Sequence, residues 1–435
     1  MPALRLVLVP LLVLAVAGCG SSLSSRSGPP SVSGTRSATT GSAATAGMLR
    51  ARLARAPAAV APVEAAALAA DNATFAGRIL ALLSRGESTI ALSPLSISES
   101  MAMAYAGARG QTAVQMQAAL AFSLPPARLH QSFNALDLSL DQVNAPGATL
   151  AVANALYGQQ GLAIRTPFLT VLARDYGSGV RTVDFERAPD AARMQINAWV
   201  DQQTDGKIAD LLSPADVDGS TRLMLVNAVY LNAKWQSPFS PDATAPAPFH
   251  APGGAVTVAT MNQTGTFAYR RESGYRVLEL PYQGDRLALD ILFPDPGRLS
   301  SLLAQLRTTG GLPAAVSDLQ PTWVALALPK LELRTRVELA GALSALGMPA
   351  AFSSGADFSG ITGAPGDLQI ARVIHEAYIR IDEAGTQAAA ATAAGASASA
   401  VVGRAIQFDV DRPFVFLLRD TTTGAVLFAG TVSLP

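Results

Sequence analysis

Cysteine and histidine are scarce in this sequence. Its 435 residues include one cysteine, Cys19, and three widely separated histidines, His130, His250 and His375. A single cysteine excludes an internal disulfide and a thiol-based catalytic or metal site. Three scattered histidines do not provide the closely spaced ligands of a zinc cluster. We therefore expect neither a metal nor a cofactor.

Neither sign of charge predominates, because 32 lysines and arginines balance 32 aspartates and glutamates. This balance gives no indication of a nucleic-acid or acidic-lipid partner. Hydrophobic residues make up 49% of the chain, which is enough to bury a large core. The length suits one large domain that follows a leader and a linker.

Lysine is also rare, and this excludes one class of enzyme. Serine hydrolases of the penicillin-binding type need a serine three residues before a lysine. The lysines of this chain are Lys207, Lys234 and Lys330. Thr204, Leu231 and Ala327 stand three residues before them, so the nucleophile motif is absent.

The N-terminus has the pattern of an export signal. One positive charge, Arg5, precedes an apolar run from Leu6 to Ala17 that is too short to span a bilayer comfortably. The small residues directly before Cys19 resemble a bacterial lipobox, so we expect residues 1–18 to be a lipoprotein signal peptide and Cys19 to be lipidated. The alternative is an ordinary secretory signal with an incidental cysteine. We expect a lipoprotein on the cell surface or in the periplasm, or release outside the cell.

Residues 19–63 have the composition of a flexible tether. They are rich in Ser, Gly, Ala, Thr and Pro and contain almost no aromatic residues, so they cannot bury enough surface to fold. We expect the folded domain to begin at Glu64 and to extend to Pro435.

Helical spacing of apolar residues is concentrated in the first half of this domain. It predicts helices from Glu64 to Leu83, from Ser93 to Tyr105 with Ser93 as the cap, and from Gln195 to Leu212 with a break near Gly206.

Strand-like segments follow the helices. Leu223 to Trp235 has the apolar composition of a buried central strand. The other predicted strands are 276–282 and 286–293, paired as a hairpin around Gly284, and 323–331, 370–381 and 414–434. Because helices and strands are segregated, the fold class is α+β with mainly antiparallel sheets.

The segment from Gly385 to Gly403 contains no aromatic and no charged residue, yet it lies between two strand-like segments of one domain. A long structureless loop in such a place is usually functional. An interdomain linker is a poor interpretation because too little chain follows it. An alanine-rich helix and a tolerated insertion are further alternatives. A fourth interpretation is a segment that can later become a strand, because small residues at alternate positions can enter a crowded sheet.

Six motifs in order resemble the serpin family from about Leu68 to Pro435. They are TIALSPLSISESMAMAYAGARGQT, INAWVDQQTDGKI, LVNAVYLNAKWQSPF, LALPKLEL, FSSGADFSGI with IHEAYIRIDEAGTQAAAATA, and FDVDRPFVFLLRDTTTGAVLFAGTV. The resemblance implies a metastable fold with three mainly antiparallel sheets and an exposed reactive-centre loop at about 383–407. A protease that cleaves this loop is trapped as an acyl-enzyme when the loop inserts into the main sheet. Such a protein is a consumed inhibitor and not an enzyme.

The resemblance assigns the start of the loop as a hinge. Inhibitory members have small residues there, as this chain does, whereas a bulky or charged residue is common in non-inhibitory members. The hinge residues are Glu383, Gly385, Thr386, Ala388, Ala389, Ala390 and Ala391. A non-inhibitory serpin that acts as a binding or chaperone-like protein is the alternative.

The scissile bond is counted from the hinge. About fourteen residues after the hinge glycine comes Ser399-Ala400, within a window from Ala398 to Val402. The small side chains there predict a serine protease with a shallow primary pocket, elastase-like or subtilisin-like, with cysteine proteases as a cross-reacting class. Arg404 would suit a trypsin-like protease but lies too far along the loop. We expect a monomer.

Two further groups carry over from the resemblance. Shutter residues lie beneath the place where the main sheet opens, and breach residues lie where insertion begins, with an ion pair between Lys330 and Glu383. The shutter residues are Ser93, Ser96, Asn227 and His375, and the breach residues are Trp235, Lys330 and Glu383.

Overall fold

The computed structural model describes residues 47–84, 88–144, 147–386 and 404–435. Its α-helices are α1 (Pro62–Ser84), α2 (Pro94–Tyr105), α3 (Gly110–Ala119), α4 (Pro126–Leu140), α5 (Thr166–Tyr176), α6 (Pro189–Gln203), α7 (Leu299–Leu306), α8 (Gly311–Ala315) and α9 (Ala340–Ala345). Short 3₁₀ helices are η1 (Asp141–Val143), η2 (Pro214–Asp216), η3 (Pro241–Ala243) and η4 (Pro349–Phe352).

The main sheet has seven strands in the order β1-β4-β3-β5-β13-β12-β11. They are β1 (Gly47–Leu49), β4 (Val180–Val183), β3 (Ala148–Gln159), β5 (Leu223–Lys234), β13 (Gly385–Thr386), β12 (Arg372–Asp382) and β11 (Leu331–Glu338). Most neighbours are antiparallel, but β3 and β4 are parallel. Strands β5 and β12 are also parallel, along Met224–Tyr230 and Arg372–Tyr378. This parallel ladder is called the seam below.

A second sheet runs in the order β14-β10-β7-β8-β9-β15-β16-β2, with β6 paired to β7. Its strands are β14 (Ile406–Asp409), β10 (Gln320–Pro329), β7 (Gly254–Glu272), β8 (Tyr275–Pro281), β9 (Leu287–Pro294), β15 (Phe414–Asp420), β16 (Val426–Val432), β2 (Ile90–Leu92) and β6 (Ala245–Ala251). The α+β class is confirmed. Two of the three expected sheets form one continuous sheet here, because the long strand β7 pairs with β6 and β10 and also with β8.

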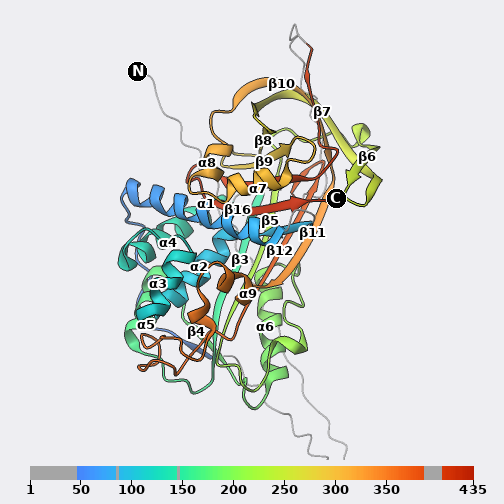
Figure 1. The fold of residues 1–435 in the computed structure, drawn as a ribbon. Coiled ribbons are helices and arrows are strands. Elements are labelled where there is room, and N and C mark those ends of the chain that lie inside the picture. Colours follow the sequence, from blue (N-terminus) through green and yellow to red (C-terminus); the bar gives the residue numbers. More distant parts are fainter. Residues whose placement is uncertain (1–46, 85–87, 145–146, 387–403) are drawn as a thin grey trace, which may run out of the picture. The chain divides into compact units, whose positions relative to one another are not determined.

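Both faces of the main sheet are buried. On β5, Leu225 and Val229 contribute to a core with α1 and α2, whereas Met224 and Val226 contact α6 on the opposite face. Figure 1 shows α2 and α4 on one side of the sheet and α6 on the other. Since both faces are covered, β5 has the continuous apolar run that the sequence indicated.

Helix α1 is long and apolar enough to cross a bilayer by length and composition, the single described helix that is. Just over half (56%) of that stretch is buried in the fold, and Leu68, Phe75 and Ile79 pack into the main core. Its apolar composition is therefore explained by its place in the core.

Three boundaries differ from the predictions. The tether predicted to extend to residue 63 ends earlier, because Gly47–Leu49 pairs with β4. The helix predicted from Gln195 to Leu212 with a break near Gly206 is α6, which begins earlier, at Pro189, and ends at Gln203. The positive φ of Asp205 and Gly206 confirms the break, but no helix follows it in residues 207–212. The single strand predicted over 323–331 is β10 and β11, which belong to different sheets.

Candidate functional site

At the upper end of the main sheet, the hinge residues Gly385 and Thr386 form the strand β13. Gly385 pairs with Lys234 of β5 and Asp382 of β12, and Thr386 pairs with Ala233 and Ile381. A Cβ on Gly385 would lie 2.1 Å from the carbonyl oxygen of Ala233, so no other residue fits without displacement of backbone. The sheet therefore already accepts a strand between β5 and β12 at this end.

Thr386 is fully buried, with 0% of its surface exposed. Its hydroxyl lies 2.6 Å from the hydroxyl of Tyr282, which is buried as well. The ring of Tyr282 stacks on the breach residue Trp235 with centroids 4.4 Å apart. The inner face at Thr386 thus has room for a small polar side chain and none for a charged one.

The backbone just before Gly385 is held by hydrogen bonds to three successive carbonyls. The Trp235 indole nitrogen donates to Asp382 O (2.9 Å), the Phe239 amide donates to Glu383 O (2.9 Å), and the Trp235 amide donates to Ala384 O (3.0 Å). Strand β13 therefore begins from a rigid base.

The ion pair expected at the breach is present. Lys330 Nζ lies 2.8 Å from Glu383 Oε2, and the Thr244 hydroxyl donates to Glu383 Oε1 at 2.8 Å. Burial opposes ionisation of Glu383, but hydrogen bonds from Lys330 and Thr244 prevail and lower the pKa of its carboxyl. Lys330 separates β10 from β11, so the pair connects the loop base to the junction of the two sheets.

The predicted shutter residues meet beneath the seam. The amide of Ser93, which caps α2, donates to His375 Nε2 at 3.1 Å. Complete burial lowers the pKa of His375 to about 3, so the imidazole is neutral and its proton is on Nδ1. Among the described residues, buried His375 Nδ1 has no hydrogen-bond partner.

Asn154 of β3 is the centre of this network, and sequence reasoning missed it. Its Oδ1 accepts from Ser96 Oγ (2.5 Å) and Asn227 Nδ2 (3.1 Å), and its Nδ2 donates to Glu99 Oε2 (2.9 Å). Registers place Asn154 opposite Asn227, and Asn227 opposite His375, across three neighbouring strands. The one feature of the sequence that indicates Asn154 is its position as the single polar residue in the apolar run AVANALY.

Two buried polar atoms at the seam therefore have no hydrogen-bond partner in the described part of the chain. They are the acceptor Asn227 Oδ1 and the donor His375 Nδ1. An unpaired buried polar group costs about 1–3 kcal/mol. Both groups lie where β5 and β12 would separate, so a new strand that brings a hydroxyl there would relieve that cost.

Glu99 makes the network sensitive to pH. Burial, followed by the nearby charge of Asp137, raises the pKa of Glu99 from 4.5 to about 8, while the hydrogen bond from Asn154 and the charge of Arg55 oppose the rise. The folded state therefore holds a proton that the unfolded state releases between about pH 4.5 and pH 8. Stability from this group is complete below pH 4.5 and is lost as the pH rises toward 8.

We expect Glu99→Gln to remove much of this pH dependence, because its amide oxygen still accepts from Asn154 and carries no charge. Thermal unfolding at pH 5 and pH 8 measures it. The variant should lose less Tm than the parent over that interval and be the more stable of the two at pH 8. Equal losses of Tm in both proteins would contradict the assignment.

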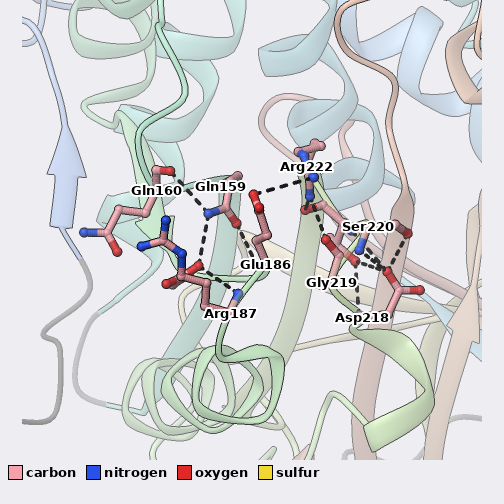
Figure 2. Close-up of polar contacts among 10 residues, drawn as sticks. Gln159, Gln160, Glu186, Arg187, Asp218, Gly219, Ser220 and Arg222 are labelled. Atoms are coloured by element: carbon pink, nitrogen blue, oxygen red, sulfur yellow. Dashed lines mark hydrogen bonds and ion pairs between the residues drawn. The ribbon is translucent and has the colours of Figure 1, made fainter.

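The lower end of the seam is a polar turn that leads into β5. Asp218 Oδ1 accepts from the Ser220 amide (2.8 Å) and hydroxyl (2.6 Å), and Arg222 donates to Gly219 O (2.8 Å) (Figure 2). Glu186 lies 3.7 Å from the guanidinium of Arg222. The Ala371 amide bonds to Leu223 O (2.9 Å), where the seam ends.

Other predicted residues lie outside the described part of the chain. These are Cys19, Ala388, Ala389, Ala390, Ala391, Ser399 and Ala400. The hinge geometry above is therefore that of Glu383, Gly385 and Thr386.

Comparison with known proteins agrees with this geometry. The family model described as "Serpin (serine protease inhibitor)" matches residues 70–435. Leukocyte elastase inhibitor of Bos taurus is 39% identical over 359 residues, which cover 80% of this chain and 93% of that protein. An uncharacterized serpin-like protein of Thermococcus kodakarensis is 36% identical, over 81% of this chain and 82% of its own length.

Among solved structures, Serpin48 of the insect Tenebrio molitor superposes with a TM-score of 0.75 at 30% identity. The match covers 85% of this chain and 98% of that one. The family model thus covers the seam, the hinge and every described strand except β1, and the chain belongs to the serpin family.

Proposed function

We propose that this serpin inhibits a serine protease as a suicide substrate, with an elastase-like or subtilisin-like enzyme as its target. Serpins are generally protease inhibitors and not catalysts, and relatives such as leukocyte elastase inhibitor carry that activity in their names. The observation that carries the proposal is the strand formed by Gly385 and Thr386 between β5 and β12.

The register of that strand supports loop insertion along the seam. Gly385 faces Lys234 and Asp382, and each residue further along an inserted loop would face one residue further back on both strands. Continued in this way, the loop would bring Thr392 opposite both Asn227 and His375. A threonine hydroxyl both donates and accepts, so it would suit Asn227 Oδ1 and His375 Nδ1, the two unpaired atoms.

The same register relates the proposed scissile bond to the lower pole. An inserted loop would pass Leu223, the first residue of β5, at residue 396. Ser399 would then come level with Ser220, in the polar turn of Figure 2. An acyl-enzyme at Ser399 would thus be carried to the end of the sheet opposite to the one where it formed, as the proposed mechanism requires.

The location is part of the proposal. The lipobox-like sequence at Cys19 and the leader before it support export and attachment to a membrane by lipid. A protease outside the cell or at its surface is then the class of target, since the inhibitor would meet it there.

The direct test is incubation with an elastase-like and a subtilisin-like protease, followed by denaturing electrophoresis. We expect a covalent complex that survives detergent, together with a released C-terminal peptide. The mass of that peptide identifies the scissile bond, which we expect within Ala398–Val402. A trypsin-like protease is the comparison, since Arg404 is its nearest suitable residue. Clean cleavage by both small-pocket proteases without any complex would refute inhibition.

A further inference from the structure

Residues 47–61, called the N-terminal arm, lie along the fold before the first helix. In β1, Gly47 pairs with Thr182 and Leu49 with Val180, so the arm covers the edge of the main sheet at β4. Further on, the Ala56 amide donates to Arg174 O of α5 at 2.8 Å. The arm therefore connects the sheet edge to the helices beneath it.

Arg55 makes the arm's strongest polar contacts, and both are with α4. Its Nε donates to Asn134 Oδ1 at 2.7 Å, and its Nη2 forms an ion pair with Asp137 Oδ2 at 2.6 Å. Asn134 returns a hydrogen bond from Nδ2 to Ala56 O at 3.0 Å. The Arg55 side chain is only 23% exposed, so these charge-assisted bonds contribute more than a surface ion pair would.

The charge of Arg55 extends its effect to the network under the seam. Asp137 and Glu99 line one cavity of about 270 Å³ with Ser93, Ser96 and Asp141. Burial is the main cause that raises the pKa values of Glu99 and Asp137, and the charge of Asp137 adds to the rise at Glu99. The positive charge of Arg55 opposes the rise at both carboxyl groups. Arg55 is thus the cation that pairs with the Asp137 carboxylate in the cavity that Glu99 also lines, and Glu99 in turn is hydrogen-bonded to Asn154.

Separation of β5 from β12 would move strands against the helices. Helix α2 contacts β12 through Ser93 and His375, and it contacts β3 through Ser96, Glu99 and Asn154. Opening the seam would therefore require β3 and its neighbour β4 to shift over α2 or away from it. The arm opposes such a shift because it attaches β4 to both α4 and α5.

We propose that the N-terminal arm holds the seam closed through Arg55, and that its release makes loop insertion easier. This inference rests on the proposed function for its biological meaning, but the structural effect does not depend on a protease. If Cys19 is lipidated, the chain between Cys19 and the arm would connect the contacts of Arg55 to the membrane anchor. Proteolysis or tension on the arm would then adjust the reactivity of the inhibitor.

The test is Arg55→Ala in the full chain, with Arg52→Ala as the matched control. Arg52 lies on the same arm, is exposed, and makes no ion pair within the described residues. Amide hydrogen exchange of the seam, residues 224–230 and 372–378, reports its opening. We expect about tenfold faster exchange in Arg55→Ala and no change in Arg52→Ala, since a partly buried charged hydrogen bond contributes at least that factor.

Asp137→Asn separates electrostatics from packing. If Arg55 acts by offsetting the Asp137 charge, the double variant Arg55→Ala/Asp137→Asn should recover most of the slow exchange. Equal seam exchange in Arg55→Ala and Arg52→Ala would overturn the proposal, as would fast exchange of the arm alone. Should Arg55→Ala fail to fold, Arg55→Lys, which keeps the charge but loses the paired geometry, is judged by the same exchange rates. Failure to trap any protease would refute the inhibitory function and leave this result unaffected.

Discussion

We expect Thr386→Arg to convert the proposed inhibitor into a substrate of its target protease. Thr386 is already fully buried between β5 and β12 with its hydroxyl against Tyr282. The Thr386→Arg variant would have to bury a charge there or leave the sheet, and either outcome removes the start of the proposed insertion. An unpaired buried charge costs several kcal/mol, and about 1.4 kcal/mol is already a factor of ten. The number of inhibitor molecules consumed per trapped protease should rise by at least about tenfold, with cleaved protein in place of complex.

Titration of a fixed amount of protease with the variant measures this number. Thr386→Ser is the control, because it keeps the hydroxyl that faces Tyr282 and should leave the ratio near that of the parent. Unchanged trapping by Thr386→Arg would mean that the strand at Gly385–Thr386 is not the start of insertion. Slower cleavage with normal trapping would point instead to recognition by the protease.

The second large effect is expected at Asn154. Asn154→Ala leaves Ser96 Oγ, Asn227 Nδ2 and Glu99 without their common partner. At about 1–3 kcal/mol for each buried unsatisfied group, and with incomplete additivity, we expect a loss of about 2–4 kcal/mol in the free energy of unfolding. The midpoint of chemical denaturation should fall, and inhibitory capacity should decay faster on storage at 37 °C.

Asn262→Ala is the matched control for this change. Asn262 is an exposed amide on β7 that donates to Ala243 O and Thr260 O, and the loss of those bonds should cost well under 1 kcal/mol. Equal midpoints for the two variants would show that Asn154 is a minor member of the network.

Much of the fold and of the hinge was predictable because it depends on local pattern. The apolar run of β5, the hairpin of β8 and β9, and the cap at Ser93 each have a physical signature over a few residues. The pair Lys330–Glu383 came from resemblance to a family, since 53 residues separate its members and no local rule connects them.

What could not be predicted depends on contacts across long stretches of sequence. Strand β3 was missed because its small alanines give a weak strand signal, and Asn154 was missed with it. The composition of residues 47–61 predicts a tether, because these residues can bury little apolar surface. The structure nevertheless orders this segment through three residue pairs with β4 and through the contacts of Arg55. These partners lie 79 or more residues away in the sequence.

The two-residue strand at Gly385 and Thr386 also determines which side chains of an inserted loop would face each side of the sheet. Side chains alternate between the faces of a strand, so whichever face Thr386 enters decides the face of every residue that follows it into the sheet. In an inserted loop with the present spacing, Ala388, Ala390 and Thr392 would share the inner face with Thr386, and Gln387 would take the outer one. One extra residue after Thr386 would turn the glutamine inward and Thr392 outward, whereas two would restore the order. The length of this loop is thus constrained in steps of two, independently of which protease it attracts.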